Sequence, residues 1–348
     1  MKKIALLSFC FILFFCSKNN DPNIFTKQNL AQQTQKETPS ANPSGSYKFY
    51  HGGQNRLYHY YQPLNLPKNA PLIFVLHGYN ANADDFMDWF EMSGLADEHG
   101  FALVYPQGLK DSSRRTHWNA GLTLSNVDDV GFLSELALYL QETYQLNPTQ
   151  TFTSGYSNGG FMSYELIVKK PEIFRAAASI SGTMSLKTWS NRSLAQAVPV
   201  LQLSGGLDRV VPPNGLTNLY GGWGGAPKIS DIMLFWAELN TYDVREYIEQ
   251  DQTKITKYLN SNSNNEVWYY LIEDLDHSVP MGRNNTLHTP SLIWEFFKEQ
   301  GEQESILYFY YVIIGIYGYQ LWGSKNKSVV IFEITLSNLT SQTWIGLF

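Results

Sequence analysis

Cysteine is nearly absent from this chain of 348 residues. The sequence contains two, Cys10 and Cys16, and none follows from Ser17 to the end. Without cysteine, a polypeptide has no thiolate nucleophile, no disulfide framework and no sulfur ligand for a metal. The glycine-rich run at 221–225 also lacks the Lys and the Ser or Thr of a phosphate-binding loop. These absences exclude thiolate metal sites and a phosphate-binding loop, and we expect the chain to use no metal and no cofactor.

Clusters of basic residues are missing as well. The 25 Lys and Arg residues are scattered among 31 Asp and Glu residues, and the formal net charge is -6. A surface that binds nucleic acid needs a concentrated positive field, so nucleic acid is not an expected partner. Hydrophobic residues make up 43% of the chain and aromatic residues 15%. That composition is sufficient for one large core of roughly 250 residues.

The apolar run at the N-terminus is too short to span a bilayer comfortably. It covers residues 4–15 and follows two lysines, which is typical of a secretory signal in residues 1–16. Cys16 ends the run, as in bacterial lipoprotein signals whose cysteine is lipidated, although Phe15 stands where a small residue is usual. Lipidation at Cys16, plain secretion and an uncleaved anchor all stay open. Each of them predicts a protein that is secreted or anchored on the outer side of a membrane, in the periplasm or at the cell surface.

Composition divides the rest of the chain into three parts. Residues 17–46 are polar and predict a flexible linker. Residues 47–300 carry the patterns of a folded catalytic domain. Residues 301–348 form an atypical tail, in which 306–322 is an apolar run near the lower length limit of a membrane span. Instead of spanning a membrane, the tail could form an added β-hairpin or be the product of a shifted reading frame. We expect it to be dispensable for catalysis.

Strand-like and helix-like patterns alternate through the predicted domain. Short apolar runs indicate strands buried on both faces, and a stripe of apolar residues indicates an amphipathic helix. The predicted strands are 47–50, 57–61, 71–76, 101–105, 149–153, 175–180, 198–203 and 266–272, the first two at a sheet edge, and the predicted helices are 84–99, 129–144 and 290–298. This alternation predicts an α/β fold, with a mostly parallel central sheet and helices on both faces.

A Gly-x-Ser-x-Gly pattern runs from Gly155 to Gly159. It directly follows the strand predicted at 149–153 and precedes a helix-compatible stretch. In this context the pattern is typical of a nucleophile elbow, a tight turn that exposes the serine hydroxyl. Ser157 is therefore the predicted nucleophile, and the backbone N–H of Asn158 is a predicted donor to an oxyanion.

An acid and a base follow Ser157 in the order that an α/β-hydrolase requires. Asp208 lies in a glycine-rich loop directly after the strand at 198–203, and His277 comes just after the strand at 266–272. Because the carboxyl ends of parallel strands share one edge of the sheet, these side chains can meet Ser157 there. We predict a triad of Ser157, Asp208 and His277.

Other acidic and histidine residues fit these roles less well. Asp231 and Asp243 fall in or beside a helical stretch, and His288 lies in a polar approach to the last predicted helix. The adjacent carboxylates Asp128 and Asp129 could hold a metal or act as acid and base, but they stand at the start of the helix at 129–144, where capping and interaction with the helix dipole are the expected roles.

Residues around the predicted triad complete the site. The loop after the strand at 71–76 is expected to supply a second oxyanion donor, the backbone N–H of Tyr79. For Trp118, ordinary packing in its loop is an equal alternative. For His77, we expect a role in organising its loop. The side chains interpreted as candidates for the substrate pocket are His77, Trp118, Asn119, Tyr156 and Val279.

Several motifs together resemble a known family. They are His77-Gly78 with 82–86, Trp118-Asn119, 127–132, 155–160, Asp208 with Val211-Pro212, Phe235-Trp236-Ala237 with Asn240, and His277. In this combination and order the chain resembles the polyhydroxybutyrate depolymerase-like esterases, relatives of the feruloyl and acetylxylan esterases, over roughly residues 47–298. The resemblance implies an α/β-hydrolase fold, a carboxylic ester substrate and the same Ser–Asp–His triad. The chain departs from the family at Val279, where an aromatic residue is frequent, and at 241–242, where a cysteine is frequent.

Three functions are compatible with these patterns. The first is a secreted or surface-tethered serine esterase acting on short acyl, hydroxybutyrate, feruloyl or acetyl-sugar esters through an acyl-enzyme. The second is an acyltransferase or peptidase on the same scaffold, and the third is a lipoprotein that binds without catalysis. The presence of nucleophile, acid and base in order favours the first. The sequence does not indicate the acyl group, the alcohol or the oligomeric state.

Overall fold

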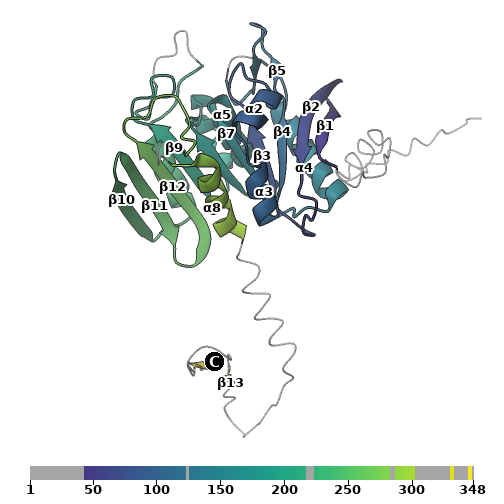
Figure 1. Ribbon diagram of the computed structural model, residues 1–348. Coiled ribbons are helices and arrows are strands. Elements are labelled where there is room, and N and C mark those ends of the chain that lie inside the picture. Colours follow the sequence, from purple (N-terminus) through teal and green to yellow (C-terminus); the bar gives the residue numbers. More distant parts are fainter. Residues whose placement is uncertain are drawn as a thin grey trace, which may run out of the picture. The chain divides into compact units, whose positions relative to one another are not determined.

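A computed structural model describes residues 43–301, apart from 123–124, 217–222 and 283–286, together with two short backbone segments near the C-terminus (Figure 1). The chain divides into two compact units, Met1–Gly301 and Glu302–Phe348. In the second unit, β13 (Val330–Phe332) pairs antiparallel with β14 (Trp344–Gly346). The predicted signal with Cys10 and Cys16, most of the predicted linker and the apolar run at 306–322 lie outside the described residues.

A ten-stranded sheet is the centre of the first unit. Its strands are ordered β1-β2-β4-β3-β7-β8-β9-β12-β11-β10. The bounds in that order are β1 (Gly45–His51), β2 (Gln54–Tyr61), β4 (Ala102–Pro106), β3 (Leu72–Leu76), β7 (Thr151–Tyr156), β8 (Ala176–Ile180), β9 (Val200–Gly205), β12 (Ser263–Ile272), β11 (Thr253–Asn260) and β10 (Val244–Gln250). The strands from β4 to β12 run parallel, and an antiparallel pair extends the sheet at each side. The predicted mostly parallel sheet is confirmed.

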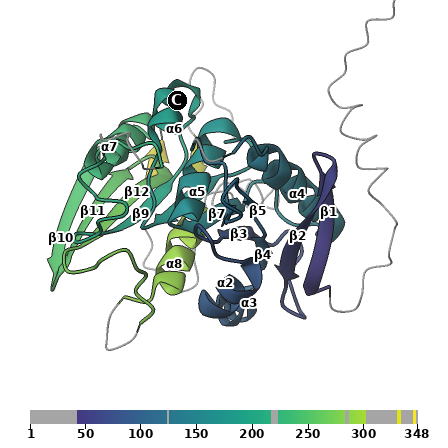
Figure 2. The same cartoon turned by 90° about the horizontal axis from the view of Figure 1, so that it is seen from above.

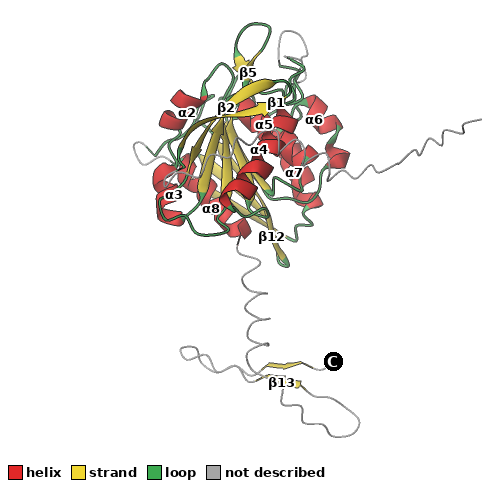
Figure 3. Cartoon of the chain, turned by 90° about the vertical axis from the view of Figure 1, so that its right-hand side faces the viewer, coloured by secondary structure: helices red, strands yellow, loops and turns green. Residues whose placement is uncertain are grey.

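Helices cover both faces of this sheet (Figures 2 and 3). Their bounds are α2 (Ala83–Trp89), α3 (Ser93–His99), α4 (Asp129–Tyr144), α5 (Asn158–Lys169), α6 (Leu186–Ser190), the short 3₁₀ helix η1 (Arg192–Leu194), α7 (Ile229–Leu239) and α8 (Thr289–Gly301). Apolar residues of α4, α5 and α7 form one hydrophobic cluster with the sheet, and those of α2, α3 and α8 form another on the opposite face. The central strands are buried on both sides for this reason, and every residue of β3 is buried. A two-stranded ribbon of β5 (Leu109–Lys110) and β6 (Thr116–His117) completes the unit.

Two details of the predicted elements are wrong, and the sequence patterns do not indicate one exposed hairpin. The strand predicted at 57–61 as an edge is β2, which lies inside the sheet between β1 and β4. The hairpin β10–β11 was not predicted, because β10 is exposed along its whole length and has no buried apolar run. The helix predicted at 84–99 is two helices, as described next.

The break between α2 and α3 lies at residues 90–92. Phe90 and Met92 are both buried, although they are two positions apart and would point to different sides of a continuous helix. The Glu91 carboxylate accepts a hydrogen bond from the N–H of Gly94 at 3.1 Å, at the start of the second helix. Core packing therefore overrides the helical pattern here. α3 ends as predicted at Gly100, whose φ of 74° is left-handed.

The parallel strands bring three loops to one edge of the sheet. β7, β9 and β12 all end there, and they are followed by Ser157, by the loop of Asp208 and by the loop of His277.

No helix in the described part of the chain is both long and apolar enough to cross a membrane.

Candidate active site

Ser157 occupies a strained turn between β7 and α5. Its φ of 52° and ψ of -117° are unfavourable for a residue with a side chain. The turn is possible because its neighbours are glycines: a Cβ at Gly155 would lie 2.2 Å from the carbonyl carbon of Gly159, and a Cβ at Gly159 would lie 2.1 Å from the oxygen of Leu76. The structure thus has the backbone of a nucleophile elbow.

The side chain of His277 lies within hydrogen-bond distance of both other residues of the predicted triad. Nε2 of His277 is 2.9 Å from Oγ of Ser157, and Nδ1 of His277 is 2.7 Å from Oδ2 of Asp208. The Asp208 side chain is 1% exposed, whereas that of His277 is 19% exposed. The imidazole is therefore accessible from solvent while the carboxylate is shielded, an arrangement that is compatible with acyl transfer to a serine.

The second oxygen of Asp208 is held by its own loop. Oδ1 accepts hydrogen bonds from the N–H groups of Val210 and Val211, both at 2.8 Å. These bonds fix the carboxylate and leave Oδ2 for the imidazole. The alternative His288 is an exposed partner of Ser291 at 2.7 Å, in the first turn of α8.

The loop that carries His277 is held by two hydroxyl groups. The Tyr156 hydroxyl donates to the His277 carbonyl oxygen at 2.8 Å, and Ser181 Oγ donates to the Ser278 carbonyl oxygen at 2.9 Å. Burial raises the pKa of Tyr156 to about 12, with the negative charge of Asp208 as a further cause. Tyr156 therefore stays protonated and remains a donor. Its ring lies 5.3 Å from that of His277, centroid to centroid, and Val279 is half-buried in the same loop.

The predicted oxyanion donors lie beside Ser157. The N–H of Asn158 is the first of α5 and has no acceptor within its helix. A Cβ at Gly78 would lie 3.6 Å from Cβ of Ser157, so the backbone that leads into Tyr79 runs next to the nucleophile. The side chain of Tyr79 points elsewhere, since its hydroxyl donates to Asp111 at 2.5 Å.

His77 and Trp118 do not line a surface that a substrate can reach. Both are fully buried, which contradicts their interpretation as pocket residues. Trp118 instead joins the two segments that carry the predicted oxyanion donors. Its indole N–H donates to the His77 carbonyl at 3.0 Å, and its backbone exchanges hydrogen bonds of 2.6 and 3.0 Å with the Asn158 side chain. The sequence signal was a tryptophan in a polar loop. By itself this signal does not distinguish a side chain that lines a pocket from one that supports the loop.

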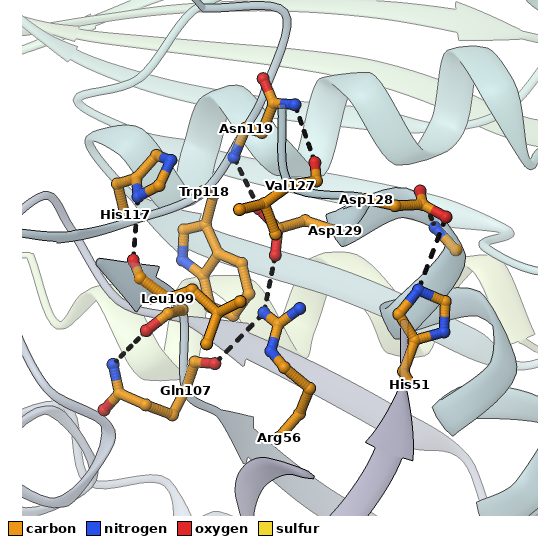
Figure 4. A network of polar contacts seen from close by, with 12 residues as sticks. His51, Arg56, Gln107, Leu109, His117, Trp118, Asn119, Val127, Asp128 and Asp129 are labelled. Atoms are coloured by element: carbon orange, nitrogen blue, oxygen red, sulfur yellow. Dashed lines mark hydrogen bonds and ion pairs between the residues drawn. The ribbon is translucent and has the colours of Figure 1, made fainter. Parts of the chain in front are cut away.

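A buried ion pair supports the Trp118 loop and was missed by the sequence analysis (Figure 4). Nη2 of Arg56 lies 2.6 Å from Oδ1 of Asp129, and both side chains are almost fully buried. Oδ2 of Asp129 accepts the N–H of Asn119 at 2.7 Å, and Asn119 Nδ2 donates to the Val127 carbonyl at 2.8 Å. Asn119 is thus a loop-bracing residue. The available signal was an arginine within the apolar alternation of β2.

Asp128 has the capping role predicted for it. Its side chain accepts the N–H of Gly131 at 2.9 Å, at the N-terminus of α4. Asp129 does not share that role, because it faces Arg56 instead. In the part of the chain that the structure describes, no group of three or more His, Cys, Asp and Glu side chains is arranged to hold a metal ion.

Acid should destabilise this site through His77. Nε2 of His77 accepts the N–H of Gly108 at 2.9 Å, and Nδ1 lies 2.7 Å from the Gly78 carbonyl, so the ring is held neutral. Burial lowers the pKa of His77 to about 4. An unfolded histidine titrates near a pH of roughly 6.5, so between these values the unfolded chain binds the extra proton. The free energy of unfolding should therefore decrease by roughly 3 kcal/mol as the pH falls through this interval.

Denaturant unfolding across this pH interval measures the effect. The matched variant is His77→Gln, whose amide can accept from Gly108 and donate to Gly78 but does not titrate. A pH dependence in His77→Gln as steep as in the wild type would contradict the assignment to His77.

The sheet order, the elbow and the Ser–His–Asp geometry together define an α/β-hydrolase fold. Comparison with known proteins agrees. Residues 57–209 match the family described as Esterase PHB depolymerase, which confirms the predicted resemblance over these residues. Acetyl xylan esterase from Aspergillus awamori superposes with a TM-score of 0.56 at 16% identity, over 73% of this chain and 99% of that one, and so has the same fold.

Two relatives of named activity match parts of the chain. Feruloyl esterase B of Thermothelomyces thermophilus is 27% identical over 130 residues, covering 35% of this chain and 42% of that protein. Poly(3-hydroxyalkanoate) depolymerase C of Paucimonas lemoignei is 28% identical over 125 residues, covering 34% of this chain and 30% of that protein. The chain thus spans less than half the length of these curated relatives. It is similar to esterases in both sequence and fold.

Proposed function

We propose that this protein is a serine esterase that hydrolyses carboxylic esters through an acyl-enzyme. The observation that carries the proposal is the pair of distances at His277, 2.9 Å to Ser157 and 2.7 Å to Asp208. These residues lie 120 and 69 positions apart from His277 in the chain. A fold that only bound a ligand would not need this alignment of nucleophile, base and acid.

The first half of the reaction forms the acyl-enzyme. Nε2 of His277 accepts the proton of Ser157 Oγ while that oxygen attacks the ester carbonyl carbon. The negative charge passes to the carbonyl oxygen, where the N–H groups of Asn158 and Tyr79 stabilise it. The bond to the alcohol oxygen then breaks, the alcohol leaves with the proton from His277, and the acyl group stays on Ser157.

The second half uses water as the nucleophile. His277 accepts a proton from water, whose oxygen attacks the acyl carbon, and then returns a proton to Ser157 as the acid is released. Throughout, Asp208 holds Nδ1–H of the imidazole and stabilises its charged form. The buried carboxylate acts by orientation and charge and takes no proton itself.

We place this esterase outside the cytoplasm, secreted or tethered at its N-terminus. This localisation is supported by residues 1–16, in which two lysines precede an apolar run and a cysteine ends it. A tether at Cys16 would leave the polar stretch up to about residue 42 between the membrane and β1.

The test is a substrate panel applied to the full chain. It contains short acyl, feruloyl, acetyl-sugar and hydroxybutyrate esters, together with a matched amide and an acceptor alcohol. Hydrolysis of at least one ester, with the amide left intact and no acyl transfer to the alcohol, is the expected result. Preferred cleavage of the amide, or transfer to the alcohol in place of water, would replace the proposal by a peptidase or an acyltransferase. No turnover of any ester would favour a binding protein.

A further inference from the structure

Strand β10 is an open edge of the sheet. Among the described strands it pairs with β11 alone, and it ends the strand order (Figure 1). All seven of its residues are exposed, including Val244 at 41%, Tyr247 at 57% and Ile248 at 43%. Three large apolar side chains thus stand in solvent beside a row of unpaired backbone groups.

Proteins usually protect such an edge with proline, with lysine or other charged side chains, or with a bulge, and of these β10 has only charged side chains, at Arg245, Glu246 and Glu249. The strand contains no proline and no lysine, and its register with β11 is continuous over all seven residues, without a bulge. The opposite edge, β1, is protected. There Phe49 is buried, and His51 lies 2.9 Å from Glu135 of α4.

The backbone groups available for pairing can be assigned from the hairpin. β10 and β11 are joined by Asp251 and Gln252, and the pair that closes this two-residue turn is Gln250–Thr253. In such a hairpin the closing pair is hydrogen-bonded and the bonding alternates from there. The N–H and C=O groups of Arg245, Tyr247 and Glu249 therefore point away from β11. Two copies of β10 would close about six backbone hydrogen bonds through them.

The sequence of β10 is complementary to itself. In an antiparallel pair with its two-fold axis at Tyr247, the strand overlaps its copy over all seven residues. Arg245 then lies opposite Glu249 of the second copy, and the same pair recurs by symmetry. A two-fold axis at Glu246 would instead place Glu246 opposite Glu246 of the second copy, where the two like charges repel. An axis at Ile248 would place Asp251, which belongs to the turn, opposite Arg245.

From these observations we propose that the protein forms a dimer in which β10 pairs antiparallel with β10 of a second copy. The two sheets become one continuous sheet, in which Val244 and Ile248 lie opposite Gln250 and Glu246 of the second copy. The candidate active site lies at the ends of β7, β9 and β12, so both sites of the dimer stay accessible. The proposal does not depend on the esterase function, because the oligomeric state is measured without substrate.

The experiment is sedimentation analysis of the full chain over a concentration series. Wild type should dissociate reversibly from dimer to monomer. Arg245→Glu places two glutamates opposite each other at both symmetric positions and should raise the dimer dissociation constant by on the order of tenfold. The double variant Arg245→Glu/Glu249→Arg exchanges the charges and should return it toward the wild-type value. Lys48→Glu, which makes the same charge change on the other edge strand, should have no effect.

A backbone variant tests the pairing independently of charge. Tyr247→Pro removes an N–H that points away from β11, so the hairpin should remain while the dimer is lost. Circular dichroism and ester turnover report whether each variant is folded. If the wild type is a monomer at all concentrations, the proposal is wrong. This holds whether β10 then remains unpaired or pairs with another segment of the same chain. A dimer unchanged in both Arg245→Glu and Tyr247→Pro would overturn it as well.

Discussion

Replacing Ser157 with alanine is expected to lower kcat for ester hydrolysis by on the order of 10⁵- to 10⁶-fold, the scale found when a triad nucleophile is removed. Without Oγ no acyl-enzyme can form, and any remaining turnover comes from water in a site that still binds the substrate. The strained backbone at residue 157 is no obstacle, because alanine has the same Cβ as serine. Steady-state rates with the best ester of the panel measure the loss, and burst kinetics with the wild type show the acyl-enzyme.

The matched control is Ser154→Ala. Ser154 lies three residues earlier in β7, is fully buried, and its Oγ has no hydrogen-bond partner among the residues that the structure describes. Ser154→Ala removes the same hydroxyl group without changing a triad residue, so the kcat of this variant should stay near the wild-type value. Equal rates in Ser157→Ala and Ser154→Ala would rule out the proposed mechanism.

Removing the carboxylate of Asp129 is expected to reduce the free energy of unfolding by about 3–5 kcal/mol, because Asp129→Ala leaves Arg56 charged and buried without a partner. Burial already lowers the pKa of Arg56, and the charge of Asp129 is the main opposing cause. The N–H of Asn119 also loses its acceptor. Denaturant unfolding at neutral pH measures the change.

Two comparisons separate charge burial from other effects. Asp128→Ala removes the neighbouring carboxylate, which is exposed and caps α4, and should cost only about 1 kcal/mol. The double variant Arg56→Met/Asp129→Leu removes both charges and fills the space with apolar side chains, so it should be far more stable than Asp129→Ala. If Asp129→Ala and Asp128→Ala destabilised the protein equally, the pair would not be the buried support that the structure shows.

We expect this support to matter for catalysis as well as for stability. Asp129 holds Asn119, and the adjacent Trp118 binds both the His77 carbonyl and the side chain of Asn158. Hydrogen bonds of this kind orient the N–H donors that an oxyanion needs. Trp118 is thus a fully buried support beside the predicted oxyanion donors and not a side chain that lines the pocket.

The lipidation of Cys16 and the role of residues 306–322 stay predictions, because both lie outside the described residues. The same holds for the dispensability of the tail. The catalytic roles of Ser157, Asp208 and His277 await the kinetic tests, while their positions are known.

The sequence by itself determined the parts of this protein whose signals are local. Short apolar runs mark buried strands, the helix at 129–144 was predicted with its observed bounds, and the glycines around Ser157 mark a turn that only small residues allow. Because parallel strands end at the same edge of a sheet, the strands that precede Ser157, Asp208 and His277 also predict that these residues lie at a common edge.

Only the tertiary structure decided what depends on residues distant in the sequence. It separated α2 from α3 through the burial of Phe90 and Met92, and it joined Arg56 to Asp129 across 73 positions. It also left β10 uncovered at the end of the sheet. The physical reason is common to all three: whether a side chain is buried, paired or exposed is set by neighbours that the chain brings together only on folding, and periodicity along the sequence carries no record of them.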